Sequence, residues 1–203
     1  MSRLAQFRKH ALIGLLVAIW IPAIGFGINK LVAYSTTPGR AAEPPEMWPR
    51  KAPVERVPGK FTLLMFTHPQ CECTQASLGE LAIIMAHSAD RAAATVLFFE
   101  PSQEPAEWTH SDLWKTAAAI PSVHAAEDRN AEIAQAFGVF TSGQTLLYDP
   151  DGRLIFKGGI TASRGHSGDN AGRSAITAML LGNIPRHGLP ITTRTFGCSL
   201  RGE

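Results

Sequence analysis

The feature that most constrains this chain is an uncharged, apolar run from Ala11 to Ile28, near the start of its 203 residues. Eighteen residues of this kind reach the ~17–25 that a membrane-spanning helix needs. Pro22 lies inside the run, where proline is tolerated if neighbouring groups satisfy the freed backbone. We therefore predict a transmembrane anchor over residues 11–30. A cleaved secretory signal is the alternative, but its apolar region usually spans only ~7–15 residues.

The segment before this run carries positive charge. Arg3, Arg8 and Lys9 precede it, and by the positive-inside rule residues 1–10 then stay in the cytoplasm. Everything after the anchor is predicted to lie on the other side of the membrane. The net charge of the chain is only +2, which is too small to indicate nucleic-acid binding.

Composition divides the remainder of the chain. Residues 31–57 contain five prolines, which disfavour a helix and suit an extended tether, although Met47 and Trp48 are candidates to dock on the domain. We predict a folded domain over residues 58–184. The tail at 185–203 shows no clear periodicity and carries the third cysteine, Cys198.

Strand and helix patterns alternate within the predicted domain. Phe61–Phe66 and Thr95–Phe99 are short apolar runs that end before prolines, which is typical of buried strands. Two further runs flank Asp149-Pro-Asp-Gly152, a strong hairpin signal. Helical patterns follow the strands, the last of them near Ser174–Leu181. This order predicts a layered α/β domain, with helices on both faces of a mixed sheet.

Two cysteines lie between the first predicted strand and the first predicted helix of the domain. Cys71 and Cys73 follow Pro69, and a helical spacing of apolar residues begins at Leu78. Free N–H groups and the helix dipole stabilise a thiolate at a helix N-terminus and lower its pKa. Glu72 adds a negative charge that opposes this effect. The junction is therefore predicted to carry thiol chemistry.

A strand that ends in a cysteine pair, a helix and a terminal ββα unit resemble the thioredoxin fold. Three stretches are more closely similar to a bacterial family labelled RedB: 67–74 (THPQCECT), 140–149 (FTSGQTLLYD) and 158–170 (GGITASRGHSGDN). The similarity runs from about Phe61 to Leu200. It implies a thioredoxin-like domain with a redox role, anchored by one span in the bacterial inner membrane and facing the periplasm or another extracytoplasmic space.

Two features depart from ordinary thioredoxins. Their active site is Cys-x-x-Cys, whereas only Glu72 separates the two cysteines here. They also carry a cis-proline before the hairpin, where this chain has Thr141-Ser142-Gly143. That proline helps to dock extended partner peptides, so its absence puts ordinary peptide–disulfide exchange in doubt. Thr141 and Ser142 are the candidate support residues at this position.

We interpret the chain as a membrane-tethered thiol–disulfide oxidoreductase that needs no cofactor. Its partner would be a protein thiol or disulfide client, or a membrane redox protein. A Cys71–Cys73 disulfide would close a very small ring, so it should be strained and easily reduced, as a catalytic disulfide is. In this interpretation Cys71 is the attacking thiolate and Cys73 is the resolving thiol. Cys198 leaves an odd count, which suggests a free thiol or intermolecular pairing. It is a candidate to return to Cys71 or Cys73 as a resolving thiol or to bind metal beside them, and the alternative is a small buried residue packed under Phe196. A static structural disulfide is the alternative for the pair.

A metal-binding function is the competing hypothesis. Cys71, Cys73 and His68 offer two soft thiolates and an imidazole, a set suited to Cu(I) or Zn(II). The chain would then be a metallochaperone or a non-catalytic partner of a membrane complex. A Gly- and Ser-rich loop also supplies Arg164 and His166, which are candidates to hold an anionic substrate group. Asp169 or Asn170 in the same loop can instead cap the last helix.

Overall fold

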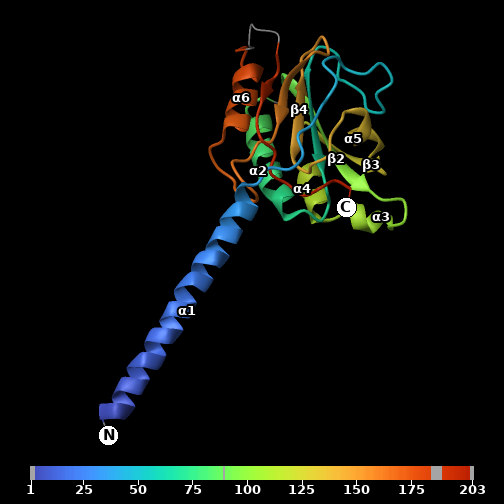
Figure 1. The fold of residues 1–203 in the computed structure, drawn as a ribbon. Coiled ribbons are helices and arrows are strands. Elements are labelled where there is room, and N and C mark those ends of the chain that lie inside the picture. Colours follow the sequence, from blue (N-terminus) through green and yellow to red (C-terminus); the bar gives the residue numbers. More distant parts are fainter. Residues whose placement is uncertain (1–2, 89, 184–188, 202–203) are drawn as a thin grey trace. The chain divides into compact units, whose positions relative to one another are not determined.

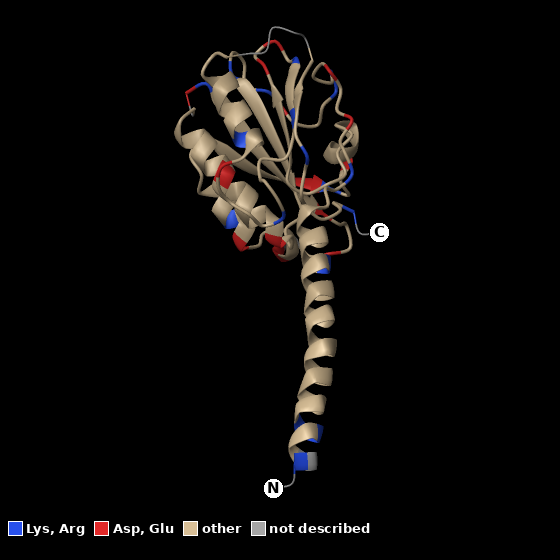
Figure 2. Ribbon diagram, turned by 60° about the vertical axis from the view of Figure 1, so that its left-hand side comes forward, with Lys and Arg blue, Asp and Glu red and all other residues tan. Residues whose placement is uncertain are grey.

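The structure of this protein is a computed structural model that describes residues 3–88, 90–183 and 189–201. The chain separates into two units, residues 1–37 and residues 38–203. The first unit is a single helix, α1 (Arg3–Thr36), which includes Pro22. Within its segment Gln6–Thr36 an 18-residue window has a mean hydropathy of 2.4, and Figure 2 shows charged residues only toward the two ends of the helix, with an uncharged stretch between them. By length and composition α1 can serve as a membrane anchor.

A six-stranded sheet forms the centre of the second unit, in the order β3-β2-β1-β4-β5-β6. Its strands are β1 (Phe61–Thr67), β2 (Ala92–Glu100), β3 (Val123–Arg129), β4 (Gln144–Tyr148), β5 (Leu154–Gly158) and β6 (Ile191–Thr192). The first three are parallel to one another, whereas β4 is antiparallel to both β1 and β5. This arrangement confirms the predicted mixed sheet and hairpin.

The central strand β1 is buried on both faces. Successive side chains of a strand point to opposite sides, so Leu63 and Met65 enter one hydrophobic cluster while Leu64 and Phe66 enter the other. All four are 0% exposed. This explains why β1 is a continuous apolar run rather than an alternating one.

Helices cover both faces, as the sequence predicts for a thioredoxin-like α/β domain (Figure 1). The first cluster contains residues of α2 (Glu72–Ala86), α4 (Asp112–Ala118) and α6 (Ala171–Leu180). The second contains residues of α5 (Glu132–Ala136). A short helix, α3 (Ala106–Thr109), follows β2. The carboxyl end of β1 therefore meets the amino end of α2 on a framework that is packed from both sides.

The expected tether over residues 31–57 differs from the structure. Helix α1 continues to Thr36, and the compact unit begins at Pro38 rather than at residue 58. Trp48 packs edge-to-face on Phe137 and Tyr148, at ring-centroid distances of 5.1 and 5.0 Å. Its backbone N–H donates to the Gly152 carbonyl (2.7 Å). The segment forms no helix after Thr36 and contains turns, and its backbone and aromatic contacts make it part of the domain.

The tail expected over 185–203 also belongs to the fold, within its described residues. Strand β6 pairs in parallel with β5, and the chain then passes along the end of β4. Thr195 Oγ1 donates to Gln144 Oε1 (2.6 Å), and Leu200 is 3% exposed. These contacts bring the region of Cys198 back across the sheet.

Candidate thiol site

Cys71 occupies the N-cap position of α2. Its backbone is extended (φ −87°, ψ 114°), and no side-chain cap bond is made. The Cys71 N–H donates to the His68 carbonyl (3.0 Å), and the Thr74 N–H donates to the Cys71 carbonyl (2.9 Å). This tight turn starts the helix and holds the thiol at the positive end of a 15-residue helix. The predicted placement of Cys71 is confirmed.

Ser142 ties this turn to the loop before β4. Its Oγ accepts a hydrogen bond from the His68 N–H (3.0 Å) and lies 3.2 Å from Thr74 Oγ1. The N–H of Gly143 donates to the Phe66 carbonyl (2.7 Å). Gly143 has a φ of +84°, a conformation that glycine adopts without strain. No cis peptide bond occurs in the described parts of the chain, so Ser142 fixes the site without a cis-proline.

The C-terminal tail pairs with this same loop as a short antiparallel segment. Ser142 N–H donates to the Cys198 carbonyl and Leu200 N–H to the Phe140 carbonyl, both at 2.9 Å. Thr141 and Ser199 form the bridge between these two bonds. Cys198 Sγ then lies 3.0 Å from Cys71 Sγ. A return of Cys198 to the pair is one of the alternatives that the sequence leaves open, and the structure places its sulfur beside Cys71.

All three cysteines are free thiols, and they are shielded. Cys71 is 2% exposed and Cys73 is 8% exposed, whereas Cys198 is partly exposed. The site is therefore at the expected strand–helix junction, yet closed to a large disulfide substrate in this conformation.

The surroundings shift the pKa of Cys71 in the opposite direction from those of Cys73 and Cys198. Burial raises its pKa, but hydrogen bonds from the thiol and N–H of Cys198, the N–H of Cys73 and the Ser142 hydroxyl outweigh burial and leave the pKa below its ordinary value. Burial and the neighbouring Cys71 charge raise the pKa of Cys73. Burial, the hydrogen bond to Cys71 and the same charge raise the pKa of Cys198 to about 12. Of the three cysteines, Cys71 is thus the one whose thiolate form the surroundings favour most.

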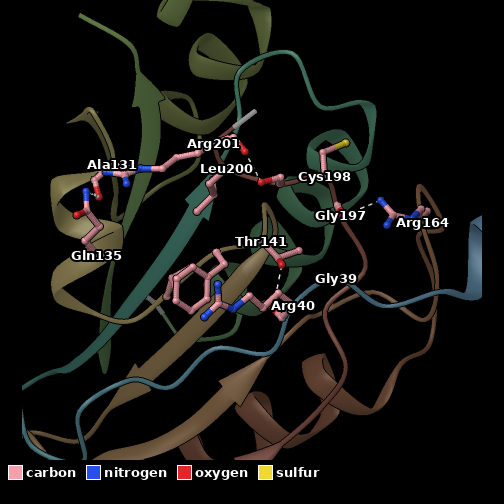
Figure 3. Close-up of a pocket in the computed structure, with 13 residues that line it drawn as sticks. Gly39, Arg40, Ala131, Gln135, Thr141, Arg164, Gly197, Cys198, Leu200 and Arg201 are labelled. Atoms are coloured by element: carbon pink, nitrogen blue, oxygen red, sulfur yellow. Dashed lines mark hydrogen bonds between the residues drawn. The ribbon is translucent and has the colours of Figure 1, made fainter. Parts of the chain in front are cut away.

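Arg164 is the cationic residue of the site. It acts on both neighbours of Cys71, lowering the pKa of Cys73 and of Cys198. Its Nη1 donates to the Gly197 carbonyl (2.6 Å), as Figure 3 shows. His166 is exposed and its Nδ1 lies 2.9 Å from the Arg164 carbonyl. The arginine predicted to bind an anion therefore also holds the tail.

The side chains of the other predicted site residues, His68 and Thr141, contact residues other than the three cysteines. The His68 ring packs against Phe99 and Trp108, at centroid distances of 5.8 and 5.3 Å, and its Nδ1 accepts from the Gln70 N–H. Burial lowers the pKa of His68. Thr141 Oγ1 donates to the Arg40 carbonyl (2.9 Å). Across residues 3–88, 90–183 and 189–201, no group of three His, Cys, Asp or Glu residues is placed to hold a metal ion.

Sequence reasoning missed two supporting residues. Glu80 is 1% exposed in α2 and binds the loop that carries Arg164. The sequence signal for Glu80 is a single acidic residue within the otherwise apolar helical pattern of α2. Gly197 passes so close to Ser142 that an added Cβ would clash with the Ser142 carbonyl oxygen, and no sequence pattern reveals this contact.

A cationic cavity of about 510 Å³ adjoins the tail. Arg40, Arg164 and Arg201 contribute to its lining, and none of its described lining residues is acidic. Arg40 stacks on Phe140, with its guanidinium carbon 3.6 Å from the ring centroid. Figure 3 shows the Cys198 sulfur directed away from Arg40 and Thr141. The thiol therefore belongs to the Cys71 side of the tail.

Solved structures share this fold at low sequence identity. An uncharacterized conserved protein from Geobacillus kaustophilus is 17% identical, with 83% of this chain and 93% of that chain covered and a TM-score of 0.56. A hypothetical protein from Sinorhizobium meliloti is 19% identical, with coverages of 82% and 94% and a TM-score of 0.55. An exposed lipoprotein thioredoxin from Streptococcus pneumoniae is 18% identical, with coverages of 61% and 84% and a TM-score of 0.45. No family model matches the sequence, nor does any curated protein.

The lowered pKa of Cys71 predicts an unusual pH profile. Alkylation follows the thiolate, so an ordinary thiol with a pKa near 8.5 loses roughly 25-fold in rate between pH 9 and pH 7. Cys71 should lose less, because its thiolate persists until the pH falls through the lowered pKa. Ser142→Ala removes one donor and should move the midpoint to higher pH, whereas Ser102→Ala should not. Site-resolved mass spectrometry of alkylated Cys71 measures this, and a midpoint equal to that of the unfolded chain contradicts it.

Proposed function

We propose that this chain is a membrane-tethered thiol–disulfide oxidoreductase in which Cys71 is the attacking thiolate. The observation that carries the proposal is the Cys71 sulfur at the N-terminus of α2, with a lowered pKa and the Cys198 sulfur 3.0 Å away. The thiolate attacks one sulfur of a client disulfide and forms a mixed disulfide, while the other client sulfur leaves as a thiolate. A second thiol of the chain then displaces the client, so the client is reduced and two cysteines are oxidised.

The tether is part of the proposal. Helix α1 is long and apolar enough to span a bilayer, and Arg3, Arg8 and Lys9 at its start favour a cytoplasmic amino terminus. The domain would then face the periplasm of a bacterial inner membrane, where disulfide chemistry operates. The resemblance to the RedB family supports this assignment. The proposed partner is a protein thiol or disulfide, or a membrane redox protein.

Exchange of this kind needs no cofactor, because sulfur atoms carry both electrons. The competing Cu(I) or Zn(II) site would use the cysteine pair and His68, but the His68 ring packs on Phe99 and Trp108 instead. Titration of the reduced chain with either metal separates the two functions. Stoichiometric, tight binding together with a lack of exchange activity would favour the metallochaperone.

The reduction potential tests the redox function. A stabilised thiolate favours the reduced form and raises the potential, so the cysteines of the full-length chain in detergent micelles should titrate above ~−300 mV. The chain is equilibrated in dithiothreitol and glutathione buffers, and free thiols are counted by alkylation and mass spectrometry. A potential well below ~−300 mV indicates a structural disulfide and contradicts the proposal.

A further inference from the structure

The C-terminal tail presents a third thiol to the reactive one. We infer that Cys198, rather than Cys73, is the thiol that resolves the mixed disulfide on Cys71, so that the oxidised chain carries a Cys71–Cys198 disulfide. This inference rests on the proposed function. Its basis is the 3.0 Å separation of the two sulfur atoms and the backbone pairing that maintains it.

The tail is anchored on both sides of Cys198. Upstream, Thr195 donates to the Gln144 side chain (2.6 Å). Downstream, Leu200 is 3% exposed within the second hydrophobic cluster, and its N–H is bonded to the Phe140 carbonyl. Anchors of this kind hold a nucleophile close to its target and give it a high effective concentration. Cys198 is therefore positioned as a reactant, although it lies 127 residues from Cys71 in the sequence.

Cys73 is less well placed. It lies in the first turn of α2, two residues after the N-cap Cys71. Its thiol also hydrogen-bonds to Cys71, but a disulfide between the two would close a very small, strained ring. A Cys71–Cys73 bond would also have to form across the turn that the Thr74 N–H and the Cys71 carbonyl close. Cys198 approaches from a separate segment, so it can bond to Cys71 without rebuilding α2.

Formation of the mixed disulfide on Cys71 changes the charge next to Cys198 in a way that favours the Cys198 thiolate. While Cys71 is a thiolate, its charge and hydrogen bond help to keep the proton on Cys198. Formation of the mixed disulfide removes that charge, while Arg164 still stabilises a thiolate at position 198. The Cys198 sulfur then attacks Cys71 Sγ. The new S–S bond replaces the bond to the client sulfur, which leaves with the electron pair and takes up a proton.

A single-turnover reaction separates the two steps. Reduced full-length chain in detergent micelles is mixed with a limiting amount of 5,5′-dithiobis(2-nitrobenzoate), whose yellow thiolate reports each cleavage. Attack by Cys71 releases the first thiolate, and intramolecular resolution releases the second at a rate independent of protein concentration. Failure of the first phase contradicts the proposed function, whereas the second phase tests the role of Cys198.

Two cysteine variants give opposite expectations. Cys198→Ser should keep the first phase and slow the second by roughly tenfold or more, whereas Cys73→Ser should leave both phases near the wild-type rate. The inference is overturned if Cys73→Ser slows resolution instead, or if Cys198→Ser resolves as fast as the wild type. Trypsin releases peptides 61–91 and 195–201. Their disulfide-linked pair should be the product in the wild type, and with Cys73→Ser the bond must be to Cys71.

A glycine variant tests the docking of the tail with all three cysteines intact. Gly197→Ala places a Cβ against the Ser142 carbonyl, so the tail should undock and resolution should slow about as much as in Cys198→Ser. Gly79→Ala is the matched control, because in α2 its Cβ would meet only Ser167 Oγ at 3.9 Å. Resolution at the wild-type rate in Gly197→Ala would overturn the positioning role of the tail.

Discussion

Replacing Cys71 with serine is expected to slow disulfide reduction by the full-length chain about a hundredfold or more. The two thiols that remain, Cys73 and Cys198, both have pKa values raised by burial. A thiol with a pKa above 9 is ionised in fewer than about one molecule in a hundred at pH 7, and the thiolate is the nucleophile. Serine has nearly the size of cysteine, so the fold should be unchanged. Insulin reduction with dithiothreitol as the electron source measures the loss.

The matched control is Cys73→Ser, which removes the other member of the Cys-x-Cys pair. It should retain most of the activity, because it leaves the Cys71 thiolate and its 3.0 Å contact with Cys198 in place. If Cys71→Ser keeps more than about a tenth of the wild-type rate, the thiolate that the rate depends on lies elsewhere.

Replacing Glu80 with alanine is expected to destabilise the domain by about 3–5 kcal/mol, the cost of removing one partner of a buried ion pair. Glu80 is 1% exposed and accepts from Arg173 Nη1 (2.6 Å), Asn170 Nδ2 (3.2 Å) and the Gly168 N–H (2.7 Å). The arginine side chain is itself only 17% exposed. Alanine would remove the one buried acceptor that the largely buried guanidinium, the Asn170 amide and the Gly168 N–H share.

Asp169→Ala is the control, because Asp169 shares the same arginine. Its carboxylate lies 2.5 Å from Arg173 Nη2, but its side chain is fully exposed, and a surface ion pair contributes at most about 1 kcal/mol. Urea unfolding of the full-length chain in detergent, followed by near-ultraviolet circular dichroism, compares the two variants. Equal losses of unfolding free energy would show that the Glu80 cluster is not the anchor of this loop.

The sequence predicts the parts of the domain that local patterns determine. The buried run of β1, the helical spacing of α2 and the turn at Asp149–Gly152 each carry their own signal, and the structure confirms them. Asn170 caps α6 through the Arg173 N–H (2.8 Å), one of the two predicted caps. By contrast, the segment after Pro38 and the tail are held by long-range backbone bonds. Such bonds are independent of side-chain identity, so composition indicated a tether before the domain, and the tail showed no clear periodicity.

The same division applies to the site. The position of Cys71 can be predicted, because the strand–helix junction is recognisable in the sequence. Its lowered pKa also depends on hydrogen-bond donors that only the fold brings close to it. The pairing of Ser142 with Cys198 depends on a register between segments more than fifty residues apart. For His68, the predicted role rested on closeness in the sequence alone. Its closeness to the cysteines in sequence suggested a ligand, but its ring packs with Phe99 and Trp108.

The shielding of Cys71 has a consequence for its resistance to oxidation by peroxide. An exposed low-pKa sulfur reacts with hydrogen peroxide to a sulfenic acid, and further peroxide converts that species irreversibly to sulfinic acid. Because Cys71 is 2% exposed and the Cys198 sulfur lies 3.0 Å away, we expect a sulfenic acid formed on Cys71 to condense with that thiol, with loss of water, rather than to meet a second peroxide molecule. The product is a disulfide, which ordinary reductants repair.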